Sequence, residues 1–189
     1  MNPALPAPVL QVPLRRIHAL GGAPACFLID DRDAGLVLVN APDPCWADTL
    51  GEVRYLFLPS AHGARHARFW QDRGATLLAH PREPLPEGLD VRRVDTRQRL
   101  TRTIDFLPLP GATPGACALH LRNLPGVVFA GPALAGAEPL PPPGEDALFS
   151  ALYLAGLSFQ WLFWDDASAP FGPDAAARLR QGIESLLES

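Results

Sequence analysis

Residues 110–115 read Pro-Gly-Ala-Thr-Pro-Gly and form a predicted tight loop between two strand-like runs. The run before the loop, 104–109, alternates as a strand does, and the run after it, 117–121, is mostly apolar. Another apolar run at 127–130 is separated from it by the polar segment 122–126, which favours a hairpin. The sequence therefore predicts a strand, a tight loop and a hairpin in that order.

Upstream of this loop, a second group of strands is interrupted by one helix. Residues 26–29 and 36–39 are apolar and flank a polar turn that contains glycine, which predicts another hairpin. Residues 53–58 and 75–79 are short strand-like runs on either side of a helical pattern at 63–73. A strand, a helix and a strand in this order imply that the two strands are parallel neighbours.

Downstream of the loop, the spacing of apolar residues becomes helical. Residues 145–157 and 173–187 are predicted helices, and the second has a proline in its first turn, where the missing amide proton is tolerated. Between them, 159–164 is an aromatic-rich strand that ends in Asp165 and Asp166. No internal repeat or domain boundary is evident, so we expect one domain over all 189 residues.

The composition is typical of a globular protein and argues against nucleic-acid binding. Hydrophobic residues make up 48% and charged residues 19% of the chain, and the net charge is -4. The basic residues are all arginines, which excludes a lysine Schiff base and a P-loop lysine. The proline-rich N-terminus lacks the pattern of a signal peptide, and no stretch approaches the roughly 20 apolar residues that cross a membrane. We therefore expect a cytoplasmic protein with no membrane or nucleic-acid partner.

The three cysteines are Cys26, Cys45 and Cys117. No two of them are spaced as a CxxC metal or redox pair, and the odd number argues against a disulfide framework. Each lies beside apolar residues, so the sequence predicts three buried free thiols.

The order of these elements resembles the metallo-β-lactamase superfamily, from about Val12 to the end of the chain. The most specific piece is 110–115, which looks like the Pro-Gly-His-Thr-Pro-Gly loop of that family, followed by the expected hairpin. Other stretches that look like the family lie at 35–40, 55–58, 79–81, 129–132 and 170–174. The resemblance implies an α/β (α+β) protein with a four-layer αββα sandwich. It implies nothing firm about activity, because function belongs to the site rather than to the fold.

The resemblance also implies where a metal site would lie, and most of its ligands are missing here. Enzymes of the family hold zinc or iron ions, which lower the pKa of a bound water until it attacks the substrate as hydroxide. Their loop His-x-His-x-Asp-His corresponds to 60–65 here, where only His62 matches and the cationic Arg65 replaces a histidine. The positions of the family's pocket are occupied by Asn40, Ser60, His62, Ala64, Arg65, Ala112, Pro132 and Asp166. We therefore predict no metal and no cofactor.

Three interpretations of the remaining polar residues stay open. His62 and one or both of Asp165 and Asp166 could hold a metal weakly. Alternatively, His62 is a hydrogen-bonded pocket residue and the aspartates cap a strand end. In the third, Arg65 pairs with one of these carboxylates and connects the loops in place of a metal. The candidate catalytic residues are Ser60, His62, His66, Asp165 and Asp166.

These observations lead to three hypotheses about function. The first is a binding or interaction protein that has lost its metal site and takes a small-molecule ligand or a protein partner. The second is an enzyme that reuses the cleft without a metal, and the third is a hydrolase with a displaced, weakly held metal. Pairing into a homodimer is compatible with all three, and the sequence names no substrate.

Overall fold

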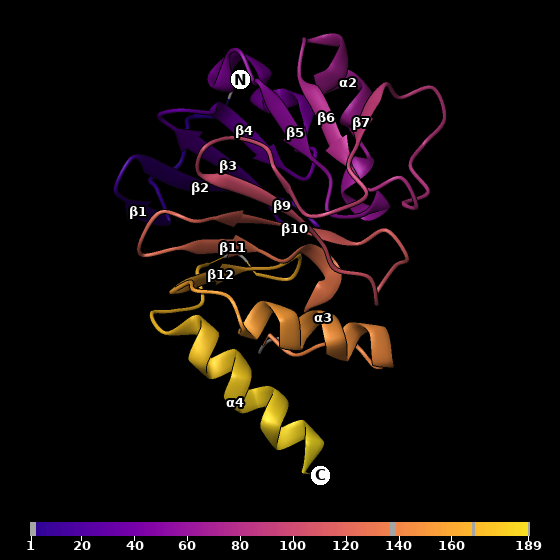
Figure 1. The fold of residues 1–189 in the computed structure, drawn as a ribbon. Helices are drawn as coiled ribbons and strands as arrows, with labels where there is room; N and C mark the ends of the chain where they lie inside the picture. The colour runs from indigo at the N-terminus through magenta and orange to yellow at the C-terminus, as the bar shows by residue number, and fades with distance from the viewer. Residues whose placement is uncertain (1–2, 137–138, 168, 189) are drawn as a thin grey trace.

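Two β-sheets packed face to face form the centre of the molecule (Figure 1). The structure is a computed structural model, and it describes residues 3–136, 139–167 and 169–188. The first sheet, sheet A, comes from the N-terminal half of the chain, and the second, sheet B, comes from the C-terminal half. Helices cover the outer face of each sheet, so the layers follow the predicted order αββα.

Sheet A has its seven strands in sequence order from β1 to β7. The strands are β1 (Leu10–Val12), β2 (Arg15–Gly21), β3 (Cys26–Asp31), β4 (Gly35–Val39), β5 (Tyr55–Phe57), β6 (Thr76–Ala79) and β7 (Val91–Arg93). The first four are antiparallel, and β4 to β7 are parallel. The parallel pairing of β5 with β6 confirms the prediction made from the intervening helix.

Sheet B has five strands in the order β12-β11-β10-β9-β8. The strands are β8 (Gln98–Arg99), β9 (Ile104–Pro108), β10 (Cys117–Leu121), β11 (Val127–Phe129) and β12 (Trp161–Phe163). All neighbours are antiparallel except β11 and β12, which are parallel. The loops that follow these two strands therefore leave the sheet at the same edge, and this edge carries Asp165 and Asp166.

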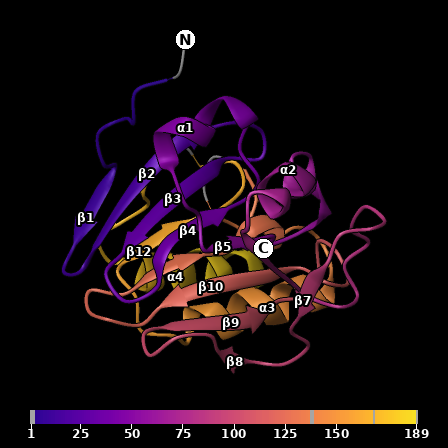
Figure 2. The same cartoon turned by 90° about the horizontal axis from the view of Figure 1, so that it is seen from above.

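Short helices cover sheet A and longer helices cover sheet B. In Figure 2, which looks down onto sheet A, α1 (Ala47–Leu50) and α2 (Ala67–Asp72) lie on its outer side. The outer side of sheet B is covered by α3 (Glu145–Ala155) and α4 (Ala175–Leu187). Trp70 of α2 packs into the apolar core between sheet A and its helices, and Leu154 of α3 packs into the corresponding core between sheet B and its helices.

Aromatic side chains fill the core between the two sheets. Phe27 of sheet A has its ring centroid 4.9 Å from that of Phe163 and 5.5 Å from that of Phe129, both in sheet B. Phe57 and Phe106 make a similar contact, with centroids 5.7 Å apart. Such contacts bury aromatic surface between the two sheets and stabilise their packing.

The structure corrects the sequence prediction at several points. The helical pattern at 63–73 divides into a 3₁₀ turn, Ala61–Ala64, and the shorter helix α2. Helix α1 and strand β8 were not predicted. The prediction of three buried thiols is wrong for Cys45, which is exposed in the 3₁₀ turn Pro44–Trp46, whereas Cys26 and Cys117 are buried. No helix of the described residues is long and apolar enough to cross a membrane.

Candidate binding pocket

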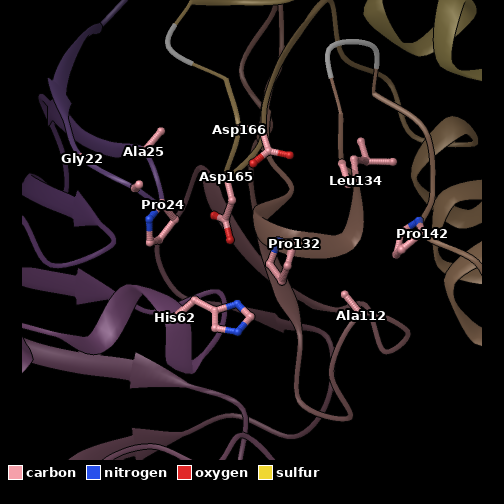
Figure 3. A pocket seen from close by; sticks show the side chains of 12 residues that line it. Gly22, Pro24, Ala25, His62, Ala112, Pro132, Leu134, Pro142, Asp165 and Asp166 are labelled. Carbon is pink, nitrogen blue, oxygen red and sulfur yellow. The ribbon is translucent and has the colours of Figure 1, made fainter.

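An open pocket of about 760 Å³ lies at the sheet edge where β5, β11 and β12 end. Its lining consists of Gly22, Ala23, Pro24, Ala25, His62, Ala112, Pro132, Leu134, Ala135, Pro142, Asp165 and Asp166. Figure 3 shows His62 coming from the loop after β5 and Asp165, from the loop after β12, pointing toward it. The walls are largely apolar, and the carboxylates of Asp165 and Asp166 are the acidic groups of the lining.

Asn40 connects two sides of this pocket from below its surface. It is buried directly after β4, and its φ of 60° lies in the left-handed region, which asparagine tolerates better than most residues. Its Nδ2 donates to the carbonyl of Ala25 at 2.8 Å and to Oδ1 of Asp165 at 3.1 Å. Asn40 thus ties the loop between β2 and β3 to the loop after β12.

The other end of the Asn40 amide faces Gly63. The Oδ1 atom of Asn40 is buried and has no hydrogen-bond partner among the described residues. A Cβ atom on Gly63 would lie 1.9 Å from this oxygen, so only glycine fits at that position. The backbone amide of Ala41 donates to the Gly63 carbonyl at 2.8 Å, which holds the two loops in this close contact.

Asp165 is the titratable residue that the pocket perturbs most clearly. Burial disfavours the charged carboxylate and raises its pKa from 3.8 to about 6. The hydrogen bond from Asn40 and the nearby His62 act in the opposite direction, and the neighbouring Asp166 adds to the increase. Asp166 itself is exposed, and its Oδ2 accepts a hydrogen bond from the backbone of Gly136 at 3.0 Å. The two adjacent carboxylates therefore have different environments.

The structure brings only some of the predicted site residues together. His62, Ala112, Pro132, Asp165 and Asp166 all line the pocket. Ser60 and Ala64 are buried and lie outside its lining. The Ser60 hydroxyl has no hydrogen-bond partner among the described residues, so no histidine is positioned to activate it.

Arg65 and His66 line a smaller neighbouring cavity of about 230 Å³ rather than the main pocket. The two cavities share His62 and the segment from Gly22 to Pro24, which lies between them. Arg65 is exposed, and the ion pairs found within the described residues do not include it. The structure therefore does not form the pair between Arg65 and Asp165 or Asp166 that was one of the three interpretations.

Glu83 connects two loops beside the pocket, a role that no pattern in the sequence predicts. Its carboxylate is buried, with Oε1 accepting from the backbone of Ala61 at 2.6 Å and Oε2 accepting from the hydroxyl of Thr113 at 2.7 Å. These two hydrogen bonds hold the loop after β5 against the loop between β9 and β10. No spacing rule singles out one glutamate between two prolines, so the sequence offered no signal for it.

The glycines of the 110–115 loop are explained by the same packing. A Cβ on Gly115 would lie 2.3 Å from the backbone nitrogen of Glu83, and one on Gly111 would lie 2.5 Å from the Cα of Ala147 in α3. Both positions therefore require glycine whatever occupies position 112. Ala112 between them is exposed toward the pocket and carries no polar group.

Comparisons with known proteins show which fold this chain shares with solved structures. No family model matches the sequence, and no curated protein matches it. Solved structures do match, and the three named below are 13–17% identical to this chain. An archaeal metallo-β-lactamase superfamily protein from Sulfolobus tokodaii is 13% identical with a TM-score of 0.64, over 97% of this chain and 85% of that chain. The protein has the metallo-β-lactamase fold.

Two metallo-β-lactamases from the same comparison agree with this assignment. One is a B3 enzyme described as having an active-site glutamic acid, with 17% identity and a TM-score of 0.62 over 91% of this chain and 86% of that chain. The other comes from Cronobacter sakazakii, with 15% identity and a TM-score of 0.62 over 91% and 90%. At these identities the likeness establishes the metallo-β-lactamase fold alone, and the αββα prediction is confirmed.

The metal ions that the metallo-β-lactamase fold usually holds do not fit the side chains found here. Ala112 and Pro132 line the pocket where ligands would be needed, and neither can donate an electron pair from its side chain. Within 3–136, 139–167 and 169–188, no group of three or more His, Cys, Asp or Glu side chains is placed to hold a metal ion. His62 with Asp165 supplies two such side chains at most, and Asn40 already occupies one oxygen of Asp165.

Proposed function

We propose that this protein binds a small molecule in the pocket beside Asp165 and does not act as a metal-dependent hydrolase. The ligand class is an organic cation: a protonated amine attached to an apolar group. The observation that supports this class is the lining, in which the carboxylates of Asp165 and Asp166 adjoin the apolar surfaces of Pro24, Leu134 and Pro142. Pockets of this size with apolar walls and a few convergent polar groups are typical of ligand sites.

The raised pKa of Asp165 adds a second reason for a cationic ligand. A carboxylate held at a pKa of about 6 is penalised by burial in the empty pocket. An ammonium group beside it would relieve that penalty and donate a charge-assisted hydrogen bond to the carboxylate. Because Asp165 must be ionised to attract the cation, affinity should be highest above about pH 6 and should fall as the pH drops below it.

Calorimetric titration with benzylamine, benzyl alcohol and benzoate tests this proposal directly. These probes share one ring and differ in charge, so benzylamine should bind at least tenfold more tightly than the other two at pH 7.5. Asp165→Asn, which preserves the shape, should remove most of the preference, whereas Arg65→Gln in the neighbouring cavity should leave it unchanged. Equal affinity for benzoate, or full benzylamine affinity in the Asp165→Asn variant, would refute the proposal.

A metal-independent enzyme is the second candidate, and one observation favours it. A carboxyl group with a pKa near 6 beside a histidine in an open cleft is suited to act as a general base. The buried and unpartnered Ser60 hydroxyl weighs against a serine nucleophile in that cleft. Turnover of activated esters and thioesters in the presence of a chelator, abolished by Asp165→Asn, would replace the binding proposal with this one.

Elemental analysis of the purified protein distinguishes both candidates from a hydrolase with a displaced metal. We expect less than a tenth of an equivalent of zinc, iron or manganese after exposure to each ion and desalting. A stoichiometric metal that is lost in a His62→Ala variant would instead support the displaced site.

A further inference from the structure

The outer face of α3 is apolar where a surface helix is normally polar. The inner face of this helix is buried against sheet B through Ala151, Leu154 and Ala155. The opposite face exposes Phe149, Leu152 and Tyr153, with 60%, 41% and 41% of their surface accessible. These three residues follow the i, i+3, i+4 spacing of a single helix stripe. An amphipathic helix would place charged residues there, so this stripe needs a separate explanation.

The charges around the stripe are separated along the helix axis. Glu145 and Asp146, both exposed, lie at its N-terminal end. At the other end, Arg97 from the segment before β8 reaches the hydroxyl of Tyr153 at 3.4 Å, and 55% of its side chain remains exposed. The stripe is therefore negative at one end, apolar in the middle and positive at the other end. Figure 1 places α3 on the outside of the molecule, beyond sheet B.

We propose that this stripe pairs with the same stripe of a second copy of the chain, with the two α3 helices antiparallel about a twofold axis. At 1.5 Å per residue, Asp146 lies about 5 Å on one side of the point midway between Phe149 and Ser150, and Tyr153 lies about 5 Å on the other. A twofold axis through that point brings Asp146 of each copy to the Tyr153 and Arg97 end of the other. Phe149 and Leu152 of the two copies then pack at the centre.

The self-complementary charge pattern is what favours a second copy over other occupants. Isologous interfaces require that each patch be complementary to itself under the twofold rotation, and a stripe with opposite charges at equal distances from its centre meets this condition. An anionic membrane surface would instead favour a face with basic residues throughout, and Glu145 and Asp146 oppose it. The aromatic Phe149 and Tyr153 are also the residue types enriched at the centre of protein interfaces.

Sedimentation velocity of the full-length chain from 1 to 200 μM tests the pairing. We expect a concentration-dependent dimer in the wild type and a monomer throughout in Phe149→Glu, with circular dichroism confirming that the variant is folded. Leu187→Glu is the matched control, because Leu187 is 61% exposed but lies on α4 outside the stripe. A wild type that stays monomeric at 200 μM, or a dimer that Phe149→Glu leaves intact, would overturn the proposal.

A charge exchange separates this geometry from pairing through any other apolar surface. Glu145→Arg with Asp146→Arg should weaken the dimer by roughly tenfold or more, because like charges then face each other across the axis. Adding Arg97→Glu to the same chain should restore most of the affinity. A fold check of Arg97→Glu alone is needed because Arg97 also pairs with the buried Asp105 at 3.1 Å. Folded variants in which the third substitution restores nothing would refute the antiparallel arrangement.

Discussion

Two sides of the pocket are held together by contacts of opposite character. On one side, both oxygens of the Glu83 carboxylate accept hydrogen bonds, and the loops that contain Ala61 and Thr113 are fixed to each other. On the other side, Asn40 makes two hydrogen bonds but leaves its Oδ1 without a partner in the described structure, and the carboxyl of Asp165 is penalised by burial. On the Glu83 side, both carboxylate oxygens have a hydrogen-bond donor. On the Asp165 side, the Oδ1 of Asn40 has no partner among the described residues, and burial disfavours the charged form of Asp165. We therefore expect the Glu83 side to contribute stability, and the ligand binding that we propose would take place on the Asp165 side.

The largest effect is expected for Glu83→Ala. Removal of the carboxylate leaves the amide of Ala61 and the hydroxyl of Thr113 without their acceptor, which should lower the free energy of unfolding by about 2–4 kcal/mol. Thr113→Val removes only one of the two bonds and should cost about 1–2 kcal/mol. Urea denaturation measures both, with the exposed Glu87→Ala as control. A loss below about 1 kcal/mol for Glu83→Ala would mean that the two loops are held together by other contacts.

The contact between Gly63 and Asn40 should give the next largest effect. Gly63→Ala places a methyl group against the Asn40 oxygen, and overpacking of this kind costs about 1–3 kcal/mol. In an Asn40→Gly background the oxygen is absent and the left-handed backbone is retained, so the same substitution should cost much less. A double-mutant cycle from urea denaturation gives the coupling free energy. Additive effects would show that the alanine is disfavoured for a reason other than the Asn40 side chain.

Asp165 should make stability depend on pH in a defined window. Its folded pKa of about 6 exceeds the unfolded value of 3.8. Between these pH values the carboxyl of Asp165 therefore binds its proton more tightly in the folded protein than in the unfolded chain. The resulting stabilisation is fully present below about pH 3.8 and is lost as the pH rises to about 6. The free energy of unfolding of Asp165→Asn, relative to that of the wild type, should therefore be about 2 kcal/mol higher at pH 7 than at pH 4. The exposed Asp166→Asn serves as control, and parallel curves for all three proteins would contradict the assignment.

The sequence predicted the fold well because the fold depends on patterns that are local. Residues 104–109 and 117–121 alternate or cluster as strands do, and the loop between them keeps the glycines that its packing requires. Gly111 and Gly115 are needed for close approach to Ala147 and Glu83, which explains why the loop is recognisable although position 112 carries no ligand. Packing requirements of this kind persist independently of the chemistry of the site.

The site was less predictable because its contacts join residues that are far apart in the sequence. His62, Asp165 and Asp166, which were singled out through the family resemblance, all line the pocket. Glu83 meets Thr113, and Asn40 meets Asp165, across intervals of 30 and 125 residues. Neither partnership leaves a periodic or spacing signal, because the geometry is created by the packing of the two sheets. The pair of Arg65 with Asp165 or Asp166, one of the three interpretations left open by the sequence, is not among the ion pairs of the described residues.

Arg65→Ala should produce the smallest effect, and it tests which residues connect the loops. An arginine that replaced a metal as the link between loops would be buried and paired, and its removal would leave a buried carboxylate unpaired at a cost of about 3–5 kcal/mol. Arg65 is exposed, and no ion pair of the described residues includes it, so its truncation should change the free energy of unfolding by less than about 0.5 kcal/mol. A loss of about 2 kcal/mol or more in urea denaturation at pH 7 would restore the ion-pair interpretation, since substitutions at exposed positions rarely lower the free energy of unfolding by that much. Combined with a large loss in Glu83→Ala, a small effect here would assign the connection of these loops to Glu83, a carboxylate outside the family's metal-ligand positions.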